Sequence, residues 1–158
     1  MHEQPQPEHA WLQNLVGEWT VEMVASMGPD QPPITHKGRE RFRSLGGMWF
    51  VGESVYDMPD GAPSDMIMTL GFNAATKRYC GTFIGSMMSA MWIYDGTREG
   101  NTLTLDTEGA SFSGDGSIVP YQDIIEFQGD DVRTLSSQTK GPDGTWTRFM
   151  TATYRRVK

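Results

Sequence analysis

The sequence predicts an all-β fold, namely a closed antiparallel up-and-down β-barrel of about ten strands with a short N-terminal helix. Turn residues recur at short intervals, and the runs between them alternate apolar with polar side chains. No connection is long enough for a crossover helix, so neighbouring strands must be antiparallel. Pairing the first strand with the last removes both exposed edges, which favours a barrel over a sandwich. About ten strands make a barrel wider than the eight whose side chains just fill the lumen, so an interior cavity is expected.

The N-terminal segment predicts a tail followed by a helix. Residues 1–6 contain two prolines and no periodicity, so we expect a disordered tail. Pro7 suits a first helical turn, where Glu8 complements the helix dipole. So short a helix is marginal alone, and we expect it to dock across one end of the barrel. Residues 7–158 then form a single domain, in keeping with the usual length of one domain.

Period-two alternation gives each predicted strand an inner and an outer face. Methionine recurs on the apolar faces of several runs, and its flexible, polarisable side chain suits irregular apolar ligands. The alternative is that these side chains only fill the core. The apolar positions that we expect to form a cavity wall are Met23, Met66, Met68, Met88, Trp92 and Met150.

Charge and cysteine content exclude several classes of function. With 13 Lys and Arg against 20 Asp and Glu, the net charge is −7, which repels phosphate backbones and anionic lipid headgroups. Nucleic acid and membrane surfaces are therefore poor candidate partners. The single cysteine, Cys80, cannot form an internal disulfide, and no signal peptide is visible. We expect a cytoplasmic protein that is a monomer or a homodimer.

Several motifs along the chain occur together in one known family. They are Glu8–Trp19 followed by Met27–Pro29, Gly46–Val51, Leu70–Asn73 with Thr76–Tyr79, Gly141–Gly144, and the closing Met150–Arg156. In this combination the chain resembles a bacterial family catalogued as domain of unknown function 1579. The resemblance covers nearly the whole chain and implies a lipocalin-like barrel, but no established activity. The family often carries a Trp-Asp pair where this chain has Phe83-Ile84-Gly85.

Three residues are expected to close the barrel. A Gly-x-Trp on the first strand and an Arg on the last are how calycin-type barrels such as lipocalins and fatty-acid-binding proteins are closed, and here these are Gly17, Trp19 and Arg156. The favoured interpretation is structural: the Arg156 guanidinium stacks on the Trp19 indole where the first and last strands meet. The alternative is that the pair borders a ligand cavity.

Arg148 is the charged candidate for the cavity wall, because it shares its strand parity with Met150. It could anchor a ligand carboxylate, as in fatty-acid-binding proteins. It could equally lie near the open end and extend into water, which is the favoured alternative. Glu53 and Asp123 are possible internal partners.

No catalytic or metal-binding motif is visible. The histidines are His2, His9 and His36; they lack metal-ligand spacing, and none lies on a late strand, where some related barrels hold haem. We therefore expect no metal and no cofactor. Ser86 lacks the Gly-x-Ser-x-Gly turn of hydrolases, and Cys80 has no nearby His base.

Function is expected to lie in the barrel interior. The first hypothesis is a protein that binds a small hydrophobic or amphipathic molecule. The second is an enzyme that uses Arg148, Glu53, Tyr56 or Asp123, and the third is a filled barrel that serves only as an interaction partner. A binding protein should show an apolar cavity with one polar anchor. An enzyme should show converging inward polar groups with a perturbed titration, and a filled barrel no cavity.

Overall fold

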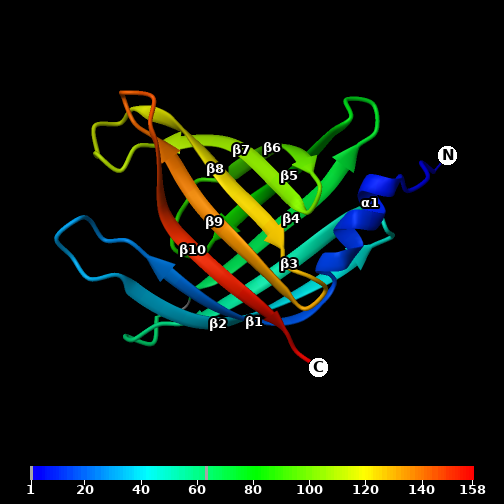
Figure 1. The fold of residues 1–158 in the computed structure, drawn as a ribbon, viewed down its shortest axis with the longest axis horizontal. Helices are drawn as coiled ribbons and strands as arrows, with labels where there is room; N and C mark the ends of the chain where they lie inside the picture. The colour runs from blue at the N-terminus through cyan, green and yellow to red at the C-terminus, as the bar shows by residue number, and fades with distance from the viewer. Residues whose placement is uncertain (1, 63) are drawn as a thin grey trace.

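A computed structural model describes residues 2–62 and 64–158, in which ten antiparallel strands form a closed barrel (Figure 1). Each strand pairs with its neighbours in sequence, and β1 closes the barrel against β10. The predicted fold class, including closure by the first and last strands, is confirmed. The strands are β1 (Gly17–Ala25), β2 (Ile34–Leu45), β3 (Trp49–Asp57), β4 (Asp65–Asn73), β5 (Arg78–Gly85), β6 (Trp92–Glu99), β7 (Thr102–Ala110), β8 (Ile118–Phe127), β9 (Val132–Lys140) and β10 (Trp146–Arg156).

A short helix covers one end of the barrel (Figure 1). Helix α1 (Pro7–Leu12) has its proline in the first turn, as predicted, and continues into the 3-10 helix η1 (Gln13–Leu15). Leu12 and Leu15 are fully buried, so the helices are anchored by apolar packing. Neither helix is long and apolar enough to cross a membrane, and the same holds throughout the described part of the chain.

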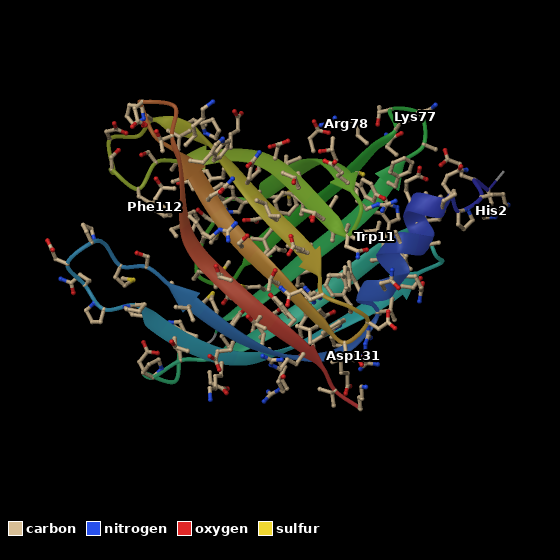
Figure 2. The ribbon with its side chains drawn as sticks, viewed as in Figure 1. His2, Trp11, Lys77, Arg78, Phe112 and Asp131 are labelled. Atoms are coloured by element: carbon tan, nitrogen blue, oxygen red, sulfur yellow. The ribbon has the colours of Figure 1, made fainter. Side chains whose placement is uncertain are left out.

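The two ends of the barrel differ in their connections. At the helix end the strands are joined by short turns, such as residues 46–48 and 100–101. At the opposite end the connections are longer, as at residues 26–33, 86–91 and 111–117. Figure 2 shows Trp11 at the helix end and Phe112 at the opposite end. We call the end with the longer loops the mouth.

The most deeply buried apolar side chains lie toward the helix end. Strand β7 illustrates the gradient, since Leu103 and Leu105 are fully buried whereas Thr107 and Gly109, on the same face toward the mouth, are only partly buried. On β1, likewise, Trp19 and Val21 are buried, and Met23, which is nearer the mouth on the same face, is only partly buried. The helix half of the interior therefore holds a packed core, and any cavity must lie toward the mouth.

Candidate functional site

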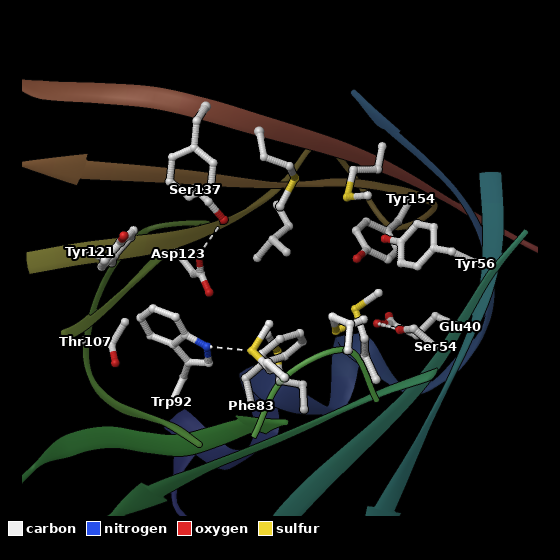
Figure 3. Close-up of a pocket in the computed structure, with 18 of the residues that line it drawn as sticks. Glu40, Ser54, Tyr56, Phe83, Trp92, Thr107, Tyr121, Asp123, Ser137 and Tyr154 are labelled. Carbon is white, nitrogen blue, oxygen red and sulfur yellow. Dashed lines mark hydrogen bonds between the residues drawn. The ribbon is translucent and has the colours of Figure 1, made fainter. Parts of the chain in front are cut away.

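A cavity of about 360 Å³ occupies the interior of the barrel (Figure 3). Its wall is largely made of methionine and aromatic side chains contributed by many strands. Six of the seven residues expected in the wall line it, and Met87 and Phe149 lie there as well. The six are Met23, Met66, Met68, Met88, Trp92 and Met150.

Arg148 is the expected wall residue that the structure places elsewhere. Arg148 pairs with Gln138 on β9, but Met150 pairs with the very next residue, Ser137, so Phe149 is an extra residue in a β-bulge. Phe149 and Met150 both line the cavity, whereas Arg148 is exposed. The exposure of Arg148 agrees with the favoured alternative, that it extends into water. Its place in the cavity wall, which was predicted from strand parity, is corrected because the bulge changes the parity between Arg148 and Met150.

Trp19 and Arg156 lie at the helix end and pair across the closure of β1 on β10. The guanidinium carbon of Arg156 lies 4.3 Å from the centre of the Trp19 ring. Arg156 also donates hydrogen bonds to the carbonyl oxygens of Val16 (2.7 Å) and Asn14 (2.8 Å), which ties β10 to η1. Gly17 is needed here, because a Cβ would lie 2.6 Å from Nη1 of Arg156, and its φ is +136°. None of these residues lines the cavity.

A second arginine, Arg133, contacts two residues of the cavity wall, Glu40 and Tyr154, and it was not predicted from the sequence. It is 2% exposed, forms an ion pair with Glu40, and its guanidinium carbon lies 3.9 Å from the centre of the Tyr154 ring and 4.7 Å from that of Trp19. Glu40 lines the cavity and also accepts a hydrogen bond of 2.9 Å from the Ser54 hydroxyl. The charge of this carboxylate is therefore compensated by a cation of the protein itself.

Asp123 is the second carboxyl group in the cavity wall. Its two oxygens accept hydrogen bonds of 2.5 Å from the hydroxyls of Tyr94 and Ser137. Burial raises the pKa of Asp123, while the two hydrogen bonds act in the opposite direction. Burial, followed by the charge of Asp123, holds the pKa of Tyr94 well above its usual value, so Tyr94 stays a donor. Among the described residues, no Lys, Arg or His forms an ion pair with Asp123.

The polar groups of the wall fall into two clusters on opposite sides (Figure 3). Glu40, Ser54, Tyr56 and Tyr154 lie on one side, and Thr107, Trp92, Tyr121, Asp123 and Ser137 lie on the other. We call the second set the Asp123 cluster. Within the described residues, the buried hydroxyl of Thr107 has no hydrogen-bond partner.

Trp92 is held in place from two directions. Its indole Nε1 donates to the sulfur of Met88 at 3.1 Å. On the other side, Gly109 leaves room for the ring, because a Cβ at that position would lie 2.3 Å from it. Trp92 thus connects strand β6 to the loop that carries Met87 and Met88, and this loop forms part of the mouth.

Four aromatic rings pack edge to face near the mouth. Trp92 and Tyr121 have ring centres 5.0 Å apart, as do Phe112 and Phe149. Tyr121 joins the two pairs, with its ring centre 5.8 Å from that of Phe112 and 6.0 Å from that of Phe149. Phe112 lines the cavity and yet is 71% exposed, so apolar surface of the cavity reaches the solvent at this end.

Other candidate residues lie outside this site. Glu53 is exposed on β3, so it is not an internal partner for a buried charge. Burial raises the pKa of the Cys80 thiol, which disfavours the reactive thiolate. Within residues 2–62 and 64–158, no group of three or more His, Cys, Asp or Glu side chains is placed to hold a metal ion.

Comparison with known proteins gives a family and a fold. A crystal structure of Rv2717c from M. tuberculosis is similar with a TM-score of 0.64 and 16% identity, covering 98% of this chain and 100% of that one. A redesigned β-barrel, mFAP0, bound to DFHBI is similar with a TM-score of 0.51 and 16% identity, covering 91% and 100%. At such identities the likeness concerns the fold alone, and no curated protein matches the chain. Residues 4–156 match the family described as "Protein of unknown function (DUF1579)", and the chain belongs to that family.

Proposed function

We propose that this protein binds a small hydrophobic or amphipathic molecule inside the barrel. The observation that carries the proposal is the cavity of about 360 Å³ with its wall of methionine and aromatic side chains. Small-molecule pockets have volumes of about 300–1,000 Å³ and are mostly apolar with a few polar groups. Methionine side chains can adapt to the shape of such a ligand. The redesigned barrel mFAP0, which has a similar fold, is bound to the small molecule DFHBI.

An enzyme that uses the same cavity is the second candidate. The observation that favours it is Asp123, whose carboxyl group faces two hydroxyl groups and has a raised pKa. Binding is preferred because Arg148 and Glu53 are exposed and therefore contribute nothing to the cavity. The carboxyl group of Glu40 is already engaged by Arg133 and Ser54. We further propose that binding takes place in a bacterial cytoplasm, with the protein a monomer or homodimer.

The test is to fill the cavity and measure binding of Nile red, a neutral apolar dye whose emission reports its surroundings. Leu135→Trp adds an indole inside the cavity, whereas Ile93→Trp adds one at a position that is 68% exposed. We expect the unmodified protein and Ile93→Trp to bind the dye equally, and Leu135→Trp to bind it at least about tenfold more weakly.

Thermal melts must accompany these titrations. If Leu135→Trp fails to fold, Met150→Trp fills the cavity from β10 instead. Binding that is equal in the cavity-filling variant and in Ile93→Trp would contradict the proposal. So would failure of the unmodified protein to bind Nile red or any of a panel of neutral apolar molecules at micromolar concentration.

A further inference from the structure

The two carboxyl groups of the cavity differ in their electrostatic partners. Glu40 has a buried cation, because Arg133 pairs with it, and Ser54 satisfies its other oxygen. Asp123 has only neutral donors, the hydroxyls of Tyr94 and Ser137. Among the residues that line the described cavity, none is Lys, Arg or His. The wall therefore offers a ligand negative charge and no positive charge.

The carboxyl group of Asp123 retains capacity to accept further hydrogen bonds. Each carboxylate oxygen has about two lone-pair sites, and one site on each oxygen is taken by a hydroxyl. Figure 3 shows the side chain of Asp123 extending into the cavity from β8. Burial without a cation raises the pKa of this group, which reflects the cost of its charge when nothing compensates it. A bound cation would lower that cost.

A second polar group next to Asp123 lacks a partner. Thr107 is paired with Tyr121 across β7 and β8, and Leu105 is paired with Asp123, so Thr107 and Asp123 are diagonal neighbours on the inner face. The Thr107 hydroxyl lines the cavity and is buried with no hydrogen bond among the described residues. An unsatisfied buried hydroxyl is destabilising, and a ligand that carries N–H donors would satisfy it.

Aromatic rings complete the surroundings of this position. Trp92 and Tyr121 pack edge to face at 5.0 Å, and both line the cavity on the same side as Asp123. The faces of Trp and Tyr rings attract cations, and the attraction grows when water is excluded. The net charge of −7 also favours the approach of a cation from solution.

We propose that the ligand is an amphipathic cation, with an ammonium or amidinium head that pairs with Asp123 and an apolar body that packs among the methionine and aromatic side chains. This inference rests on the proposed binding function and names its ligand class. The head donates hydrogen bonds to the free lone pairs of Asp123 and to the Thr107 hydroxyl. A carboxylate ligand such as a fatty acid is disfavoured, because its charge would face Asp123 without a cation in the wall.

The test is a series of three ligands that share one body and differ in the charge of the head: naphthylmethylamine, naphthylmethanol and naphthoate. Each is titrated against the complex of the protein with Nile red. We expect the amine to bind about tenfold to a hundredfold more tightly than the alcohol, as a charge-assisted hydrogen bond allows. Naphthoate should bind more weakly than either.

Two variants locate the effect at Asp123. Asp123→Asn removes the charge but keeps the shape of the side chain, and should reduce the preference for the amine over the alcohol to about twofold or less. Asp106→Asn makes the same change in net charge at an exposed position of β7, where Gln122 donates to Asp106, and should leave the preference intact. Thermal melts of both variants confirm that they fold.

The possible outcomes separate this inference from the proposed function. Nile red binding together with an alcohol that binds as well as the amine, or with naphthoate as the best ligand, overturns the inference and leaves the binding function standing. Failure of all three compounds to displace bound Nile red also overturns the inference and leaves the binding function standing. An equal loss of preference in Asp123→Asn and Asp106→Asn also overturns it, because the effect would then come from net charge. Failure of Nile red itself to bind overturns both.

Discussion

The helix end and the mouth of this barrel differ in whether a buried carboxyl group has a cationic partner. At the helix end, Arg133 is paired with Glu40, and the guanidinium groups of both Arg133 and Arg156 lie against Trp19. Toward the mouth, Asp123 has no cationic partner and Thr107 has no hydrogen-bond partner among the described residues. Buried polar atoms without a hydrogen-bond partner occur at both ends of the described chain, His9 Nε2 and Arg133 Nε at the helix end and Thr107 Oγ1 toward the mouth, so the difference between the ends is one of charge. A region whose buried charges are paired is suited to stability, whereas a cavity with an uncompensated carboxyl group is suited to a cationic ligand.

The largest effect should come from removing the aromatic centre of the helix end. Trp19 is 1% exposed and contacts two guanidinium groups, so Trp19→Ala leaves a large cavity and uncovers both cations. We expect it to lower the free energy of unfolding by about 4–5 kcal/mol, measured by urea denaturation. Trp49→Ala, at a tryptophan that is 43% exposed, serves as the control and should cost clearly less. Equal losses would contradict the role given to Trp19.

Separating the buried ion pair should have the next largest effect. Arg133→Met leaves Glu40 buried without its cation, which should lower the free energy of unfolding by about 3 kcal/mol. Adding Glu40→Gln removes the uncompensated charge, so the double variant should recover most of that loss. Urea denaturation of both single variants and the double variant forms a complete cycle. A double variant less stable than Arg133→Met would show that the charge is not the cause.

The sequence was sufficient to predict the closure of the barrel. The Gly17-x-Trp19 motif and Arg156 come from the first and last strands, and the structure places Trp19 opposite Arg156. The same period-two alternation placed Met23, Met66 and Met68 on inner faces, where they line the cavity. Alternation predicts faces well because the two sides of a strand differ in burial along its whole length.

The polar part of the site could be predicted only in part, for two physical reasons. The bulge at Phe149 changes the parity within β10, so Arg148 faces the solvent although it is two residues from Met150. The Arg133–Glu40 pair joins two residues that are 93 positions apart in the chain, and no local pattern specifies such a partner. A signal for Arg133 did exist, since it alternates with Leu135 and Ser137, which both line the cavity.

The unpaired carboxyl group near the mouth should affect stability through pH. Burial raises the folded-state pKa of Asp123 above its unfolded value, so its contribution is fully present below the unfolded pKa and is lost as the pH rises through the folded one. Asp123→Asn lacks this loss. From about pH 4 toward pH 7, the variant should therefore gain stability relative to the unmodified protein, as measured by urea denaturation at each pH.

Asp95 gives a control of opposite sign on the same strand as Tyr94. It is exposed, and its ion pair with Arg78 lowers its pKa, so its contribution is present above the unfolded pKa and is lost as the pH falls. Asp95→Asn should thus lose stability relative to the unmodified protein as the pH rises, by a smaller amount because water screens the pair. If the stabilities of the two variants, relative to the unmodified protein, changed with pH in the same direction, the difference in environment between Asp123 and Asp95 would be contradicted.

The smallest effect on stability is expected for Arg148→Gln, and this variant also tests whether Arg148 anchors the charged group of a ligand. Because Arg148 is exposed and lies outside the cavity, Arg148→Gln should change the free energy of unfolding by no more than about 0.5 kcal/mol. Phe149→Ala, at the neighbouring residue, removes a ring that lines the cavity and contacts Phe112 and Tyr121, so it should weaken Nile red binding. If Arg148→Gln instead weakened binding of naphthoate and Phe149→Ala did not affect Nile red, an arginine would be the anchor. The ligand would then be an anion, and the contrast between a charge-paired helix end and an acidic mouth would be lost.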